Sequence, residues 1–244
     1  MKILVIMGMI ISFVFGWVGE ITALKGKADI IRKNQTIPAK TGLKLEKEDN
    51  IKTFKNTKMQ IIFKDNTVIT IGKNSLVKIA DYLFDNENST AKFRLSHGIM
   101  KTLTGKIGKF APKRFKIRTK NASIGIRGTY FVVESYEDVI KVGMISGVTE
   151  FKNLDNMKTY EVKAGEQLVF NLKEPNNVII KKGFIEPDSV KVIKNSDDTT
   201  EEISTHIKNI ADDIEEKEKE DNQAIIKESS KTFTKFIEGL KDLF

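Results

Sequence analysis

Few residues in this sequence could carry catalytic chemistry. The 244-residue chain has no cysteine and only two histidines, which excludes thiol nucleophiles, thiolate metal sites and disulfides. Ser96 and His97 are neighbours, but adjacent residues of a strand point to opposite faces, so we do not expect a serine–histidine dyad. The sequence has no dinucleotide-binding, Walker or zinc-protease motif. We therefore expect a non-enzymatic protein with no catalytic residue, metal site or cofactor.

The chemically distinctive feature is a stretch of positive charge. Residues 88–133 contain eleven basic residues and no acidic one. Within this stretch Lys116, Arg118 and Lys120 alternate with apolar residues such as Phe115, so they should share one face of a strand. Each basic group near an anionic surface contributes about 1 kcal/mol. The predicted ligand-binding residues are Lys113, Arg114, Lys116, Arg118 and Lys120.

Several partners suit such a face. The candidates are an anionic envelope glycan, a lipid surface and an envelope protein. Nucleic acid is not expected, because the aromatic residues of this stretch resemble core residues rather than stacking platforms. Two other interpretations compete with binding: the face is merely solvated, or the chain neutralises it itself. Residues 1–193 have a net charge of +14 and residues 194–244 a net charge of −6, so the acidic tail could lie across the basic stretch.

The elements that must position these charges are mainly strands. Residues 60–71 contain two β-branched runs around an Asp-Asn turn, which predicts a hairpin. Residues 115–119 alternate strictly between apolar and polar, as a half-buried strand does. Further strands are predicted near residues 130–134, 139–142 and 167–170. Many short strands with recurring glycines favour an all-β sandwich, barrel or solenoid.

The two ends of the chain differ from this β-rich body. Residues 1–16 are one lysine, an apolar run and a small residue, which is typical of a signal peptide and predicts a periplasmic or secreted protein. In the acidic tail, Ile203, Ile207, Ile210 and Ile214 form a helical stripe. We favour packing of this tail on the β-body; a coiled coil that joins two copies is the alternative.

One string of residues resembles a known family. Residues 119–133 follow the pattern T-x-x-A-x-x-G-hydrophobic-R-G-T-x-F-x-V, which is similar to the signature of the FecR domain family. The stretches Gly42–Thr53 and Phe63–Ser75 and the turns near Gly147 and Gly165 resemble further family motifs, so the resemblance covers roughly residues 18–170. It implies an all-β twisted solenoid or sandwich in an extracytoplasmic location.

The signature itself has a structural interpretation. Gly125 and Gly128 are expected to permit backbone conformations or close approaches that a Cβ would obstruct. Arg127 could place its five donors on nearby carbonyls or a carboxylate and lock the turn. Thr129 could bond to local backbone. We expect these four residues to be structural rather than ligand-binding.

The family resemblance also carries a functional expectation. FecR proteins are known chiefly as periplasmic sensors with a cytoplasmic anti-sigma segment, a transmembrane helix and a C-terminal part that meets an outer-membrane iron transporter. This sequence departs from that plan: sixteen residues precede the domain and an acidic helical stretch follows it. We therefore expect no sigma-factor regulation.

The sequence thus predicts three regions: a signal peptide (1–16), a FecR-like β-domain (17–193) and an acidic helical tail (194–244). We interpret the protein as a binding or scaffolding module of the cell envelope. One rival is a cell-surface signalling component that presents its C-terminal helices to a membrane protein. The other is an envelope glycan hydrolase with paired carboxylates.

Overall fold

The computed structural model describes residues 16–85 and 88–191, without the side chain of Arg127. These residues form one fifteen-stranded sheet with two short helical turns and one short α-helix, so the expectation of a mainly β fold is confirmed. The strands are β1 (Gly19–Lys25), β2 (Ala28–Arg32), β3 (Gln35–Pro38), β4 (Lys44–Leu45), β5 (Asn50–Thr53), β6 (Lys58–Phe63), β7 (Val68–Ile71), β8 (Leu76–Leu83), β9 (Thr90–Leu103), β10 (Phe115–Arg118), β11 (Ala122–Tyr136), β12 (Val139–Asn153), β13 (Thr159–Lys163), β14 (Glu166–Asn171) and β15 (Val178–Lys182).

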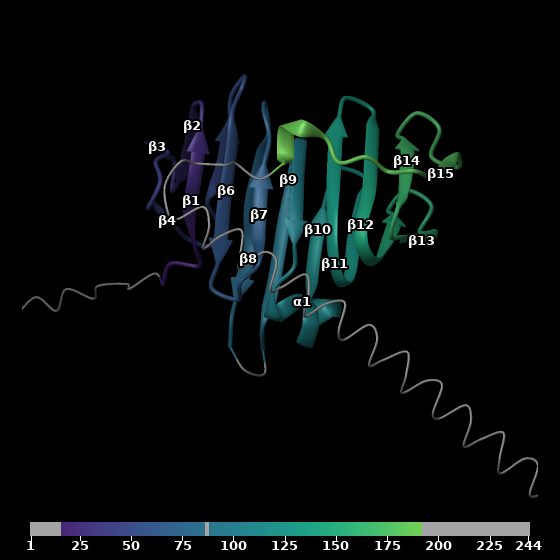
Figure 1. Ribbon diagram of the computed structural model, residues 1–244, viewed down its shortest axis with the longest axis horizontal. Helices are drawn as coiled ribbons and strands as arrows, with labels where there is room; N and C mark the ends of the chain where they lie inside the picture. The colour runs from purple at the N-terminus through teal and green to yellow at the C-terminus, as the bar shows by residue number, and fades with distance from the viewer. Residues whose placement is uncertain (1–15, 86–87, 192–244) are drawn as a thin grey trace, which may run out of the picture.

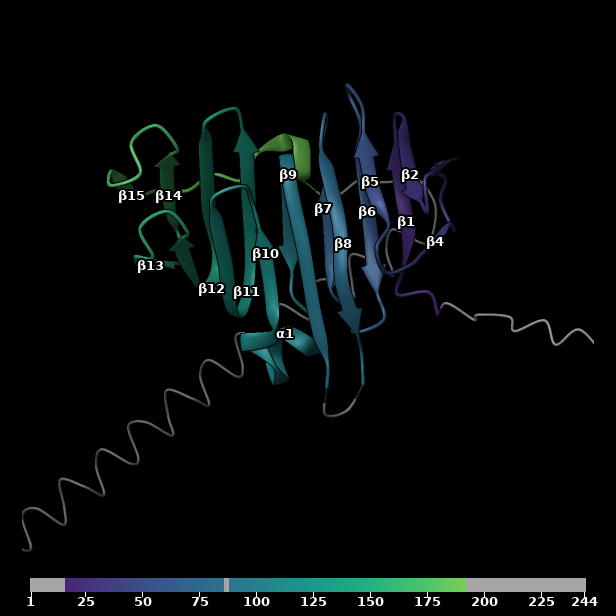
Figure 2. The same cartoon turned by 180° about the vertical axis from the view of Figure 1, so that it is seen from behind.

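The strands are arranged in two facing layers (Figure 1). The first layer has the order β4-β1-β6-β7-β9-β11-β12-β14-β15. The second layer has the order β3-β2-β5-β8-β9-β10-β11-β12-β13, and it faces the reader in the reverse view (Figure 2). The long strands β9, β11 and β12 belong to both layers and join them into one sheet.

Each of the three long strands changes layer at or next to a glycine with positive φ. Gly98 of β9 has φ +107°, Gly128 of β11 has φ +56° and Gly147 of β12 has φ +76°. Residues before Gly98 pair with β8 and β10, and residues from Gly98 onward pair with β11 and β7. Glycine adopts this left-handed backbone without the steric cost that a Cβ imposes. Three of the recurring glycines in the sequence therefore lie at the corners where a strand passes from one layer to the other.

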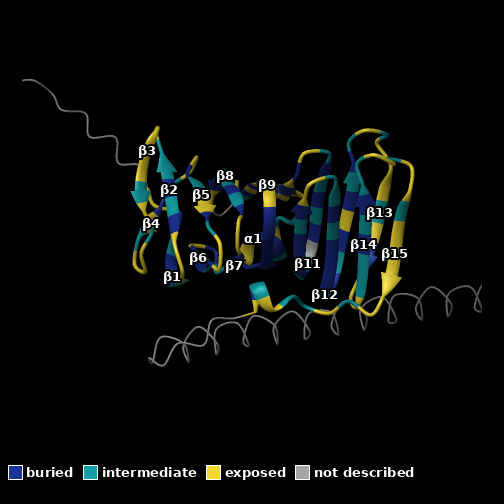
Figure 3. Ribbon diagram, turned by 90° about the horizontal axis from the view of Figure 1, so that it is seen from above, coloured by how far each residue is buried: buried dark blue, intermediate teal, exposed yellow. Residues whose placement is uncertain are grey.

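Phenylalanine rings form much of the core between the layers. Phe63 from the first layer contacts Phe93 from the second at 5.1 Å between ring centroids, and Phe93 contacts Phe115 at 5.7 Å. Phe151 and Phe170 make a similar pair at 5.5 Å. All five rings are buried within one apolar cluster that spans the described domain. Figure 3 shows buried segments along strands of both layers. This core holds the strands, and hence their outward-facing side chains, in fixed register.

The connection from β9 to β10 crosses one end of the domain as α1 (Lys106–Phe110) and the 3-10 turn η1 (Pro112–Arg114). Buried Asp65, in the β6–β7 turn, anchors this connection. Its Oδ2 accepts the N–H of Ile107 at 3.1 Å, and its backbone carbonyl accepts the N–H of Lys106 at 2.7 Å. The end of the domain therefore has a fixed position relative to the β6–β7 hairpin.

The C-terminal part of the described chain crosses the outer face of the first layer (Figure 1). This strap comprises residues 183–191 and includes the 3-10 turn η2 (Asp188–Val190). Phe184 packs over Gly143, and Val190 packs between Gly72 and Ile99. At its far end, the ammonium group of Lys58 donates to the carbonyls of Asp188 and Lys191, both at 2.9 Å. Among the described residues, no such segment crosses the outer face of the second layer, which we call the open face (Figure 2).

The local predictions can be compared with these elements. The predicted hairpin is confirmed as β6–β7, with Asn66 at φ +68°, and the predicted strand at residues 115–119 is confirmed as β10. The predicted signal peptide lies almost entirely outside the described residues, and the acidic helical tail lies wholly outside them. Within the part of the chain that is described, no helix has the length and apolar composition needed to cross a membrane.

Candidate functional site: a basic row on the open face

Strand register brings basic residues from distant parts of the sequence into one line. On the second layer Lys78 of β8 lies opposite Arg94 of β9, and Arg94 lies opposite Arg118 of β10. Arg118 lies opposite Ser123 of β11, which lies opposite Lys152 of β12. Residues that face each other in register share one face of the sheet. We call Lys78, Arg94, Arg118 and Lys152 the basic row; at about 4.8 Å per strand it spans about 19 Å.

The charges of the basic row are only partly compensated. Lys78 pairs with Glu48 at 2.5 Å. Arg94 and Arg118 are exposed and lie side by side, and the described residues offer neither of them an ion pair. Like charges placed opposite each other destabilise a sheet. An anion bound between the two guanidinium groups would remove that repulsion.

The next row along the same strands is more balanced. Lys92 pairs with Asp81 at 2.9 Å, and hydrogen bonds from Lys47 and Lys92 hold the pKa of Asp81 below its ordinary value. Lys116 lies opposite Lys92, and Glu150 occupies the same row two strands further on. Asp81 and Glu150 belong to this row, whereas the only carboxylate paired with the basic row among the described residues is that of Glu48, so the basic row is the more positive of the two.

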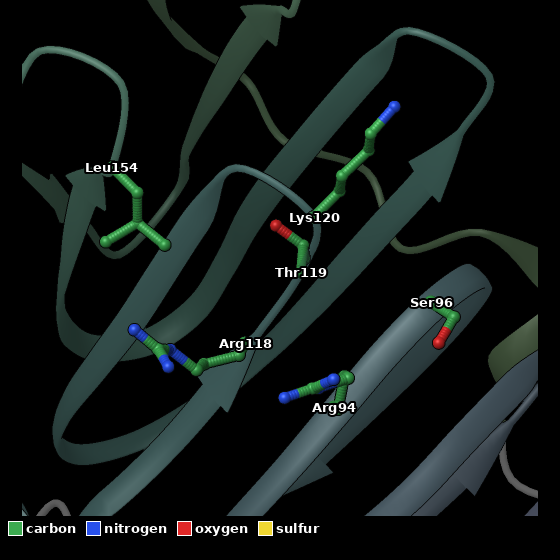
Figure 4. Close-up of a pocket in the computed structure, with 6 residues that line it drawn as sticks. All are labelled: Arg94, Ser96, Arg118, Thr119, Lys120 and Leu154. Atoms are coloured by element: carbon green, nitrogen blue, oxygen red, sulfur yellow. The ribbon is translucent and has the colours of Figure 1, made fainter.

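A groove of about 620 Å³ runs beside Arg94 and Arg118 (Figure 4). In the close-up their guanidinium groups extend toward the same side, whereas Lys120 extends away from them, and Leu154 faces the groove from the β12–β13 connection. The lining residues are Arg94, Ser96, Arg118, Thr119, Lys120 and Leu154. None of the described residues that line this groove carries a carboxylate.

The chemistry available at this site is recognition of anions. A guanidinium group is planar and presents a fork of N–H donors that matches the oxygens of a carboxylate, sulfate or phosphate. Two adjacent forks with lysines at both ends suit a chain of anionic groups better than one small anion. Ser96 and Thr119 add neutral hydroxyl groups at the groove.

The five predicted ligand-binding residues fall on two separate surfaces. Lys116 and Arg118 project from the open face of β10 while Phe115 and Ile117 are buried, as the alternation predicted. Lys120 is exposed in the turn that follows. By contrast, Lys113 and Arg114 belong to η1 and line a different groove at the end of the domain.

Sequence reasoning missed three residues of the basic row. Arg94 belongs to the acid-free stretch, but nothing in the sequence places it beside Arg118, because the two residues come together only through parallel strand pairing. Lys78 and Lys152 lie outside that stretch and join the row through the registers of β8 and β12. Only a correct prediction of strand order could have found them.

The Arg-Gly-Thr signature has a structural environment that differs in part from the expectation. Gly128 has positive φ, as expected of a corner. Gly125 has an ordinary backbone, and an added Cβ would come no closer than 3.9 Å to another residue, so the expected steric role is wrong for this glycine. Thr129 bonds to Thr104 through its backbone, whereas its buried hydroxyl has no partner among the described residues. The side chain of Arg127 is not among the described parts of the structure, so the predicted bonds from Arg127 that would hold the turn stay a prediction.

The other motif residues are buried hydrogen-bonding groups. Asp49 is fully buried, and its two carboxylate oxygens accept hydrogen bonds from Nε and Nη2 of Arg32, at 2.8 and 2.7 Å. These hydrogen bonds and the charge of Asp49 raise the pKa of Arg32. Thr53 donates to the Gly72 carbonyl at 2.6 Å and accepts the N–H of Ser75 at 2.9 Å. Asp49, Thr53 and Ser75 therefore maintain the corners and turns of the domain, whereas Thr119, the first residue of the signature, also lines the groove beside the basic row.

Comparison with known proteins identifies the class of domain. Residues 49–150 match the sequence model of the family described as "FecR protein". The match confirms, for residues 49–150, the family resemblance found in the sequence. The structure shows that the described part of the chain is an all-β domain of two layers. No curated protein sequence matches the chain. Among the described residues, no group of three or more His, Asp or Glu side chains could hold a metal ion.

Two solved structures are similar to this chain. Both are crystal structures from Parabacteroides distasonis ATCC 8503 described as a "putative anti-sigma factor", with TM-scores of 0.47 and 0.45 and sequence identities of 16% and 15%. In each case the match covers 55% of this chain and 59% of the other. This chain therefore matches less than two thirds of the length of those proteins.

Proposed function

We propose that this protein is a non-catalytic FecR-type binding module of the cell envelope that holds an anionic glycan polymer on its basic row. The observation that carries the proposal is the side-by-side placement of Arg94 and Arg118, exposed and without a carboxylate partner among the described residues, within a line of four basic residues. The strands behind these residues are held by a buried apolar core, so binding has to order the long side chains of the row but not its backbone. An extracytoplasmic location is part of the proposal and follows from the signal-like residues 1–16.

The first test measures binding of the full chain to sulfated dextran and to polygalacturonate, with neutral dextran as the uncharged comparison. We expect Arg118→Glu to weaken binding of both polyanions about tenfold or more, because the change removes one favourable contact of about 1 kcal/mol and adds a repulsive one. Affinity should fall as salt is raised, since exposed charges are screened.

A matched control separates the basic row from net charge. Lys40→Glu makes the same charge change at an exposed lysine between β3 and β4, outside the basic row and its groove. We expect this variant to bind like the wild type. Equal weakening by both substitutions would show that net charge alone attracts the polymer, and the proposed site would be rejected.

A second candidate function is cell-surface signalling, which the match to the FecR family favours. In that case the acidic segment 194–244 would contact a membrane protein, and the basic row would be incidental. Affinity purification from native envelopes, with the full chain and with a chain that ends at residue 193, distinguishes the two. Tail-dependent recovery of one membrane protein, together with no polyanion binding, would favour signalling.

A further inference from the structure

A second groove, of about 600 Å³, lies at the end of the domain, where α1 and η1 meet the β8–β9 connection (Figure 2). We call it the end groove. Its lining combines aromatic or aliphatic side chains with basic ones and contains one carboxylate, that of Asp85. The residues used below are Phe84, Lys106, Ile107, Phe110, Lys113 and Arg114.

The aromatic rings of the end groove are held outward by a well-anchored element. Phe110 is 78% exposed and Phe84 is 41% exposed. The helix that carries Phe110 is fixed at its start, because Ile107 is buried and its N–H is bonded to Asp65. Gly105 adds an N–H bond to the Thr67 hydroxyl at 3.0 Å. These bonds fix the start of the helix, and hence the position of Phe110 at the rim of the end groove, and apolar surface of this kind marks interaction sites.

The composition of the end groove specifies the chemistry of its occupant. Exposed rings favour an apolar stripe, and the surrounding Lys106, Lys113 and Arg114 favour carboxylates beside that stripe. An acidic amphipathic helix laid into a groove supplies both features. The C-terminal segment of this chain has this composition: its isoleucines recur with helical spacing, and residues 194–244 carry fourteen acidic and eight basic residues. The isoleucines are Ile203, Ile207, Ile210 and Ile214.

The position of the strap makes this contact reachable within one molecule. The strap ends beside Lys58, at the start of β6, whereas α1 is bonded to Asp65, just past the other end of β6. Seven residues of extended strand separate these points by about 23 Å. Twelve residues separate Lys191 from Ile203, and twelve extended residues reach about 40 Å. A tethered segment also has an effective concentration of about 1 mM, which favours it over a free partner.

We propose that the acidic segment around Ile203–Ile214 docks in the end groove of its own chain. This contact would leave the basic row free, so the inference does not depend on the proposed function. It also assigns Lys113 and Arg114 to an internal contact rather than to an external ligand.

The absence of cysteine allows a direct test in the full chain. Lys113→Cys combined with Lys208→Cys places one thiol on the groove rim and one beside Ile207. We expect this pair to form an intramolecular disulfide under mild oxidation, at least tenfold faster than the control pair Lys40→Cys with Lys208→Cys. Adding Phe110→Ser should slow the reaction, with thermal melting used to confirm that the domain remains folded.

Three outcomes would overturn the proposal. Equal rates for the two cysteine pairs would show that the segment has no preferred position on the domain. Disulfides formed only between chains would assign the groove to a second copy. A groove that binds vesicles of phosphatidylglycerol in a Phe110-dependent way, with no preferred disulfide, would assign it to a lipid surface.

Discussion

At the scale of single residues, buried Asp65 shows how the domain satisfies a charge without a cation. Its carboxylate accepts the hydroxyl groups of Tyr82 and Thr67, both at 2.8 Å, and the N–H groups of Thr67 and Ile107, both at 3.1 Å. Burial and the neighbouring Asp65 carboxylate raise the pKa of the Tyr82 hydroxyl, so this group stays a donor. Four donors converge on one side chain and tie two connections together.

Asp65→Asn tests this arrangement. The amide nitrogen cannot accept the bonds that Oδ2 accepts from Thr67 and Ile107, so buried donors lose their partners. We expect the free energy of unfolding to fall by about 2–3 kcal/mol, measured by urea denaturation. Asp155→Asn is the control, because the exposed carboxylate of Asp155 bonds only to the Asn121 side chain among the described residues, and the change should cost less than about 0.5 kcal/mol. Equal small losses would contradict the anchoring role of Asp65.

Lys101 is a buried basic residue that lies beneath the strap. Its ammonium group is buried, bonds to Glu186 at 2.7 Å and lies 5.4 Å from the centre of the Tyr130 ring. Burial lowers the pKa of Lys101, and the hydrogen bond to Glu186 opposes this shift. Because Glu186 belongs to the strap, this ion pair joins the strap to β9.

Glu186→Gln should destabilise the domain by about 2 kcal/mol, below the 3–5 kcal/mol of a fully buried pair, because Glu186 is partly exposed. The control Glu161→Gln removes an exposed pair with Lys163 and should cost less than about 1 kcal/mol. Urea denaturation measures both changes. If Glu186→Gln costs no more than this control, the pair does not hold the strap.

The lowered pKa of Lys101 also predicts a pH dependence. Above its pKa in the folded state, the folded protein releases a proton that the unfolded chain keeps until about pH 10.4. Relative to Lys101→Met, wild-type stability should therefore rise as the pH passes the lowered pKa and level off near the unfolded value. A stability difference that stays constant over this range would contradict the lowered pKa.

At the scale of elements, the layer change of the long strands depends on specific corners. At Gly147 an added Cβ would lie 2.3 Å from the Gly128 carbonyl oxygen. At Gly128 the space is open and only the positive φ disfavours a side chain. Gly125 has neither constraint. Three glycines near one hairpin thus experience three different environments.

A series of alanine substitutions measures these environments. We expect Gly147→Ala to cost about 3 kcal/mol or more, because a clash adds to the strain of positive φ. Gly128→Ala should cost about 1 kcal/mol from φ alone. Gly125→Ala should change stability by less than about 0.5 kcal/mol. Thermal or urea unfolding measures the loss of stability for each of the three variants. A larger loss at Gly125 than at Gly147 would contradict the assignment of Gly147 as a corner.

The elements also show what the sequence could and could not predict. Alternation and turn residues act over a few neighbours, so the β6–β7 hairpin and the exposed face of β10 were predictable. The layer change within β9 was not, because a strand that continues past Gly98 has no local signal for its new partners. For the same reason Lys113 and Arg114 were predicted to bind the same ligand as Lys116, Arg118 and Lys120, whereas the structure places them at the end groove.

At the scale of the whole molecule, the positive charge is distributed over surfaces with different surroundings. Lys101 is paired and buried, the lysines and arginine of the end groove surround exposed rings, and the basic row lies on the open face. A net charge of +8 describes none of these surfaces by itself. The FecR motifs are concentrated in buried turns and corners, so the family pattern specifies the scaffold. Arg94, on the open face, is outside those motifs, so under the proposed function the ligand is determined by residues that the family pattern does not include.

The central claim is that the basic row is the binding site, and amide NMR tests it most directly. The full chain, labelled with ¹⁵N, would be titrated with a short polygalacturonate oligomer at low salt. We predict chemical-shift changes around Lys78, Arg94, Arg118 and Lys152, which lie far apart in sequence but in one line on the second layer. Changes confined to the strap or the end groove, or no change at saturating oligomer, would contradict the account.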